Sequence, residues 1–165
     1  RRTCGCPRPT ALSIARVVID VSESSVDWPL LRQAAVEAAQ SAYCPYSGLQ
    51  VGAAALVDDG RIITGCNVEN ASYGLGLCAE CTLVGQLRLS GGGRLVALAC
   101  RSGEGELLMP CGRCRQVIYE FGGPELEVDG PSGPRPMTAV LPDAFGPEHL
   151  PAARTAPEPA SARWS

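Results

Sequence analysis

The chain has 165 residues, of which 45% are apolar and 19% charged, a balance typical of one folded domain and unlike that of a disordered chain. The net charge of -3 and the sequence pI near 5.2 disfavour a nucleic-acid partner, because phosphates are normally met by a basic surface. No apolar stretch is long enough to cross a bilayer, so we expect no membrane partner and a cytoplasmic location.

Three regions are expected along the chain. Residues 1–26 show no sustained hydrophobic period and should form a poorly ordered N-terminal arm. Residues 147–165 are rich in Pro and Ala and should form a tail that buries little surface. The functional domain is therefore expected at 27–146.

A helix and a hairpin should open this domain. Residues 27–29 (Asp-Trp-Pro) are typical of a helix start, and the helix should end near Tyr43. Two apolar runs, at 49–57 and 61–68, flank an Asp-Gly pair. This pattern predicts two strands joined by a tight turn.

The second half of the domain alternates helices with strands. Apolar residues at helical spacing from Leu83 onward predict a helix that ends at the triple glycine 91–93. Another helix is expected after Pro110 and should end at the glycines 122–123. The strands of this half are expected at 95–100, 126–128 and 137–141. The sequence thus predicts an α/β fold with a mixed sheet of about five strands between helices.

The most specific feature is a repeated Cys-x-x-Cys motif, formed by Cys78 with Cys81 and by Cys111 with Cys114. Each pair lies at the expected start of a helix, where residues three apart share a face. The positive end of the helix dipole also favours ionised sulfur. Together, the two pairs predict a zinc site.

The spacing leaves two kinds of zinc site open. All four thiolates could close around a structural ion, as in a non-catalytic Cys4 zinc module. Glu80, between two of the cysteines, favours a catalytic site, because hydrolysis needs an acid/base group near the metal that does not coordinate it. A catalytic site would use three protein ligands and keep the fourth position open.

Around these residues the sequence resembles the cytidine deaminase family of zinc nucleoside deaminases, in its small homotetrameric branch with three cysteine ligands. The resemblance extends over about 43–146. It is carried by YCPYS at 43–47, VGAA at 51–54, NVENASYG at 67–74, CAE at 78–80, PCGRCRQ at 110–116 and LPDAFG at 141–146. It implies a cytidine-deaminase-like three-layer fold and a homotetramer with shared active sites.

The resemblance also assigns the metal and the proton carrier. Cys78, Cys111 and Cys114 would hold one Zn²⁺ per chain, and Glu80 would move protons from water to the pyrimidine ring and to the leaving ammonia. The implied reaction is hydrolytic deamination of cytidine and deoxycytidine to uridine and deoxyuridine, a step of pyrimidine salvage. A deaminase of a cytosine-containing nucleoside antibiotic would use the same groups and stays open as an alternative.

The family's substrate-binding positions correspond to Asn67, Glu69, Ala79 and Phe145. Asn67 and Glu69 would bind the hydroxyls of the sugar, and the charge of Glu69 would repel a 5′-phosphate. Phe145 would reach the active site of a neighbouring subunit.

Two residues depart from the family pattern. Cys81 stands where most relatives have an arginine that donates hydrogen bonds to the zinc thiolates, so helix dipoles, backbone N–H groups or another arginine would have to replace it. We expect Cys81 to lie beside the zinc ligands without binding the ion. The alternative is that Cys81 is itself a fourth zinc ligand. Leu49 stands where relatives often have a phenylalanine near the pyrimidine.

His149, the only histidine of the chain, is expected to be solvated.

Overall fold

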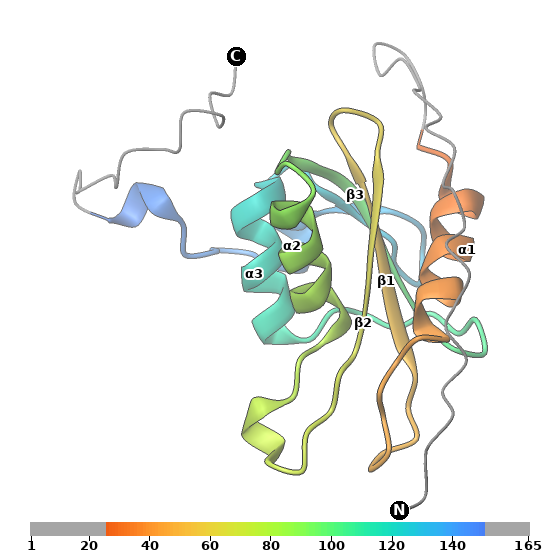
Figure 1. Ribbon diagram of the computed structural model, residues 1–165. Helices are drawn as coiled ribbons and strands as arrows, with labels where there is room; N and C mark the ends of the chain where they lie inside the picture. Colours follow the sequence, from red (N-terminus) through yellow and green to blue (C-terminus); the bar gives the residue numbers. More distant parts are fainter. Residues whose placement is uncertain (1–25, 151–165) are drawn as a thin grey trace, which may run out of the picture.

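A computed structural model describes residues 26–150 of the chain. Residues 1–25 of the expected N-terminal arm, with Cys4 and Cys6, and residues 151–165 of the expected tail lie outside the described residues. The described part forms three layers, in which a five-stranded sheet has α1 on one face and α2 and α3 on the other (Figure 1). Within residues 26–150, no helix has the length and apolar character that a membrane span requires.

The elements follow the order expected from the sequence, with two short 3-10 helices and one short α-helix in addition. They are α1 (Trp28–Ala39), β1 (Val51–Val57), β2 (Ile62–Cys66), η1 (Tyr73–Leu75), α2 (Ala79–Leu89), β3 (Leu95–Ser102), α3 (Gly112–Gly122), β4 (Glu127–Val128), β5 (Arg135–Pro136), α4 (Met137–Val140) and η2 (Pro147–His149). The strand order is β2-β1-β3-β4-β5. Only the pairing of β3 with β4 is parallel, so the sheet is mixed as predicted.

The first helix begins as predicted and ends earlier. The carboxylate of Asp27 accepts a hydrogen bond from the backbone N–H of Leu30 (3.0 Å), which caps the helix. The helix stops at Ala39 rather than near Tyr43. Tyr43 instead donates its N–H to the carbonyl of Asn67 (3.0 Å), so its backbone is engaged in strand-like pairing and cannot continue a helix.

The predicted strand at 137–141 is wrong. This segment forms the short helix α4, and the edge strand β5 comes just before it. Pro136 lacks an N–H and marks the change from strand to helix. Met137 and Val140, three residues apart, are both buried, and the N–H of Leu141 bonds to the carbonyl of Met137 (2.8 Å).

A buried ion cluster joins α1 to the sheet. The carboxylate of Asp129, whose side chain is 1% exposed, accepts hydrogen bonds from Arg32 (2.8 and 2.9 Å) and from Arg101. Arg101 also donates to the carbonyl of Cys100 (2.7 Å). Burial raises the pKa of Asp129, but the hydrogen bonds from the two arginines outweigh this effect, and the pKa lies below its usual 3.8.

Replacing Asp129 by Asn should lower the free energy of unfolding by about 3 kcal/mol at neutral pH, because the guanidinium of Arg101 would stay buried without its countercharge. The pKa of Asp129 is lower in the folded state, so its contribution is present above the unfolded pKa and is lost as pH falls through the folded value. Denaturant unfolding at several pH values measures both effects, and the difference between wild type and variant should shrink below about pH 4.

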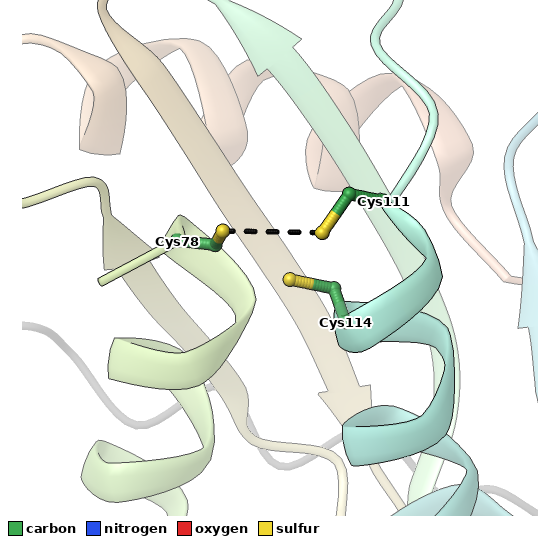
Figure 2. Close-up of side chains that lie close together, drawn as sticks. All are labelled: Cys78, Cys111 and Cys114. Atoms are coloured by element: carbon green, nitrogen blue, oxygen red, sulfur yellow. Dashed lines mark hydrogen bonds between the residues drawn. The ribbon is translucent and has the colours of Figure 1, made fainter. Parts of the chain in front are cut away.

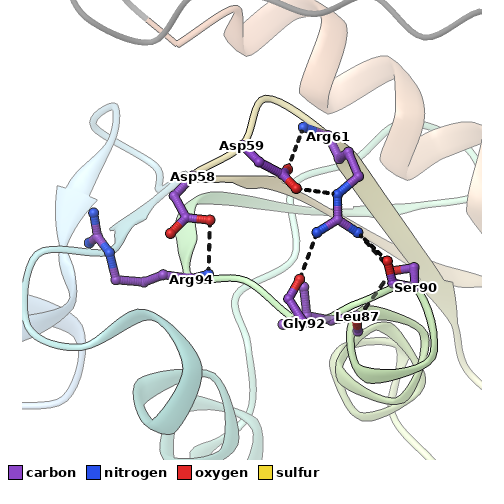
Figure 3. A network of polar contacts seen from close by, with 7 residues as sticks. All are labelled: Asp58, Asp59, Arg61, Leu87, Ser90, Gly92 and Arg94. Carbon is purple, nitrogen blue, oxygen red and sulfur yellow. Dashed lines mark hydrogen bonds and ion pairs between the residues drawn. The ribbon is translucent and has the colours of Figure 1, made fainter. Parts of the chain in front are cut away.

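Asp59 provides a matched control for that experiment. Its carboxylate pairs with Arg61 (2.6 Å) in the β1–β2 turn, but its side chain is 50% exposed. Arg61 also donates to the backbone carbonyls of Ser90 (2.9 Å) and Gly92 (2.7 Å), and so ties this turn to the end of α2 (Figure 3). Asp59→Asn should cost less than about 1 kcal/mol. Equal costs for the two Asp variants would contradict the buried-cluster interpretation.

Candidate active site

Three cysteines meet where α2 and α3 begin. Cys78 is the N-cap residue of α2 and Cys111 that of α3, while Cys114 lies in the first turn of α3. Their sulfur atoms all lie within 4.8 Å of one another, with Cys78 and Cys111 4.0 Å apart (Figure 2). Thiolates around a tetrahedral zinc at about 2.3 Å would be about 3.8 Å apart. Within residues 26–150, this is the one such cluster of metal-binding side chains.

Cys81 is not part of this cluster, although it completes the first Cys-x-x-Cys pair. It lies in the first turn of α2, where its N–H donates to the carbonyl of Cys78 (3.0 Å). Its thiol is half-buried. This arrangement favours three sulfur ligands over the four of a closed structural site.

Close backbone packing holds the two helix starts in place. A Cβ on Gly65 of β2 would lie 2.4 Å from the carbonyl oxygen of Ala79 and from the backbone nitrogen of Leu83, so only glycine lets α2 approach this closely. Arg115 fixes the other helix, since its guanidinium donates to the carbonyls of Pro110 (2.8 Å) and Val140 (3.0 Å). Nothing in the sequence pattern had indicated a role for Gly65 or Arg115.

The three thiols have different environments. The nearby backbone N–H of Cys114 is the main reason that the pKa of Cys111 is lowered. Burial raises the pKa of Cys78, and it also raises that of Cys114, where the adjacent carboxylate of Glu80 adds to the effect. A dication bound here would displace the thiol protons. Cys81 stands where most relatives are expected to have an arginine that donates hydrogen bonds to the thiolates. The backbone N–H of Cys114 is one of the groups expected to take over this role.

Glu80 lies beside the cysteine cluster. It follows the N-cap of α2 by two positions and is only 4% exposed. Its carboxylate accepts a hydrogen bond from the thiol of Cys100, with Sγ 3.6 Å from Oε1. A buried carboxylate next to a potential metal site has the position that an acid/base group requires.

A cavity of about 530 Å³ opens over these residues. Four residues that the sequence analysis connected with substrate line it: Leu49, Asn67, Glu69 and Ala79. Phe145 is not among its lining residues. Its ring is exposed and stacks on His149, with the ring centres 5.4 Å apart, and its carbonyl accepts a hydrogen bond from Gln116 (2.8 Å).

Asn67 and Glu69 also hold the loops around the cavity. The amide of Asn67 accepts from the N–H of Val51 (2.8 Å) and donates to the carbonyl of Leu49 (2.9 Å). The carboxylate of Glu69 accepts from the hydroxyl of Ser47 (2.5 Å) and from two backbone N–H groups. Both side chains retain hydrogen-bonding capacity for a ligand, because an amide has four sites and a carboxylate about four.

The remaining singled-out residues lie outside the cysteine cluster. His149 is half-exposed, as expected, and its Nδ1 accepts the N–H of Gly146 (3.0 Å). Cys44 and Cys66 are half-buried, and Cys100 is fully buried. The seven cysteines of the described part form no disulfide.

Comparison with known proteins agrees with this geometry. Residues 29–128 match the family model described as the cytidine and deoxycytidylate deaminase zinc-binding region. A cytidine deaminase of Mycobacterium tuberculosis is 63% identical over 129 residues, which cover 78% of this chain and 97% of that protein. Its crystal structure superposes with a TM-score of 0.73 over 74% of this chain and 99% of the other.

A cytidine deaminase of Burkholderia pseudomallei, 41% identical, superposes with a TM-score of 0.64 over 73% of this chain and 100% of that one. The family match extends over both helix starts that carry the cysteines and over the intervening strand. The three-layer fold, the cluster of three cysteines and these similarities show that the chain belongs to the cytidine and deoxycytidylate deaminase family.

Proposed function

We propose that the chain is a zinc-dependent hydrolase that converts cytidine and deoxycytidine to uridine and deoxyuridine with release of ammonia. The observation that carries this proposal is a cluster of three cysteines next to the buried Glu80, on the wall of a cavity of about 530 Å³. The relatives named cytidine deaminase support the choice of substrate. Action on free nucleosides would place the protein in pyrimidine salvage, in the cytoplasm.

Cys78, Cys111 and Cys114 are the proposed zinc ligands, and their sulfur-rich donor set suits this ion. When bound, zinc supplies a Lewis acid that lowers the pKa of a water in the open fourth position toward neutrality. Glu80 takes one proton from the attacking water and passes it to N3 of the pyrimidine as the C4–O bond forms. It then carries the second proton to the amino group, which leaves as ammonia while the C4–N bond breaks.

Asn67, Glu69 and Ala79 are proposed to bind the nucleoside, because all three line the cavity. The hydrogen bond from Ser47 lowers the pKa of Glu69, so this side chain carries a negative charge at neutral pH. A 5′-phosphate brought close to it would be repelled. The site should therefore select nucleosides over nucleotides.

We further propose a homotetramer in which another copy covers the mouth of the cavity and contributes Phe145. Large apolar side chains are exposed at this mouth, among them Leu49, Tyr73 and Leu77, and Phe145 is exposed away from it. Light scattering should give about four times the 17.2 kDa of one chain. A fully active monomer would contradict this proposal.

A substrate panel tests the function. The zinc-loaded protein should convert cytidine and deoxycytidine with one ammonia released per uracil product. Its kcat/KM for deoxycytidylate should be more than about 10-fold lower, because the like charges of the 5′-phosphate and Glu69 repel each other. Absence of turnover with both nucleosides, or preferential turnover of a cytosine-containing antibiotic, would refute the proposed substrate.

A further inference from the structure

Cys100 points toward the active site although the proposed mechanism gives it no role. It lies on β3, where side chains alternate between the two faces of the sheet. Leu98 and Cys100 pack in the cluster beneath α2 and α3, while Ala97 and Ala99 face α1. Cys100 is 2% exposed and forms part of the cavity wall. Strand alternation thus directs this thiol to the site.

The thiol of Cys100 contacts the carboxylate of Glu80. Its Sγ lies 3.6 Å from Oε1, and the thiol is the donor. Burial, reinforced by the charge of Glu80, raises the pKa of Cys100 well above its usual value, so the sulfur keeps its proton at neutral pH. A thiol is a weak donor, but a charged acceptor strengthens the hydrogen bond.

Zinc binding would leave this hydrogen bond in place. In the part of the chain that the structure describes, Cys100 is the thiol that forms a hydrogen bond with the carboxylate of Glu80. It is not one of the three clustered cysteines proposed to bind zinc.

We propose that Cys100 is a positioning residue, whose S–H group fixes Oε1 of Glu80 and leaves Oε2 directed at the substrate. The inference depends on the proton-carrying role of Glu80 proposed above. A carboxylate that moves two protons in succession has to keep one orientation, and a neighbour that restricts its rotation preserves that geometry. A weak donor does so without binding the carboxylate so tightly that proton transfer suffers.

Three variants of the zinc-loaded enzyme test this role. Cys100→Ala removes the donor and should lower kcat for cytidine by about 3- to 10-fold, the fold-change that corresponds to one ordinary hydrogen bond. KM should stay within about twofold, because Cys100 does not hold the substrate. Cys100→Ser restores a donor and should recover most of the lost kcat. Leu98→Val, a buried truncation on the same strand and face, should leave both constants unchanged.

The outcomes separate this inference from the proposed function. A wild-type protein that does not deaminate cytidine refutes the function, whereas an active wild type with an equally active Cys100→Ala variant refutes the positioning role. Equal losses in the Ala and Ser variants would also overturn it, since they would reflect shape rather than a donor.

Infrared spectroscopy tests the hydrogen bond without turnover. The S–H stretching band of Cys100, isolated as the difference between wild type and Cys100→Ala, should lie at lower frequency than the same band in a Glu80→Ala background. An unchanged frequency would overturn the inference.

Discussion

Replacing Glu80 by Gln should lower kcat for cytidine by about 10²- to 10⁴-fold, while zinc remains bound at one ion per chain. The amide has nearly the shape of the carboxylate, so the buried position in the first turn of α2 should still be filled. It cannot accept and return a proton, and both proton transfers of the proposed reaction would lose their carrier. Stopped-flow or steady-state absorbance assays with parallel metal analysis measure the effect.

An exposed glutamate provides the control for this substitution. Glu37 lies on the outer face of α1, away from the cavity, and Glu37→Gln should leave kcat, KM and zinc content unchanged. Activity of the Glu80→Gln variant within about twofold of wild type would refute the assigned role, because loss of an acid/base group costs far more than that. Loss of zinc from this variant would show instead that Glu80 supports the metal site.

Cys114→Ser should lower zinc affinity by more than about 100-fold, and Cys81→Ser should leave zinc bound. The two residues form a matched pair, because each lies three positions after the cysteine that caps its helix. Only Cys114 contributes its sulfur to the cluster of three. Loss of a neighbouring hydrogen-bond partner typically costs 10- to 100-fold in metal affinity, and loss of a ligand should exceed this.

Competition with a chromophoric chelator measures both affinities. The Cys114→Ser variant should also be inactive, whereas Cys81→Ser should deaminate cytidine. Loss of zinc from Cys81→Ser comparable to that from Cys114→Ser would indicate that four sulfurs bind the ion and would remove the basis for a catalytic site.

Local patterns predicted most of the fold. The start of α1 and the β1–β2 hairpin follow from neighbouring residues, Asp27 with Pro29 and the turn at Gly60, whose φ of +84° favours glycine. The segment 137–141 was mispredicted because its apolar residues fit both a strand and one turn of helix. The burial of Met137 and Val140 together decides between them, and burial depends on the packed structure.

The candidate site also combines features that local sequence predicts with contacts that only the folded chain makes. The cysteine pairs and Glu80 could be found from the sequence because their spacing lies within one turn of helix. The contact between Cys100 and Glu80 spans 20 positions, and the ion pair of Arg32 with Asp129 spans 97. No local signal connects such residues. The loop-holding bonds of Asn67 were missed for the same reason, since its partners lie on a neighbouring strand and loop.

X-ray absorption spectroscopy at the zinc edge, on the metal-loaded wild-type protein, tests the central claim most directly. With Cys78, Cys111 and Cys114 as ligands, the spectrum should require three sulfur atoms at about 2.3 Å and one lighter atom at about 2.0 Å. A fit that requires four sulfur atoms and no oxygen would mean that the ion is closed to water, and it would contradict the proposed chemistry.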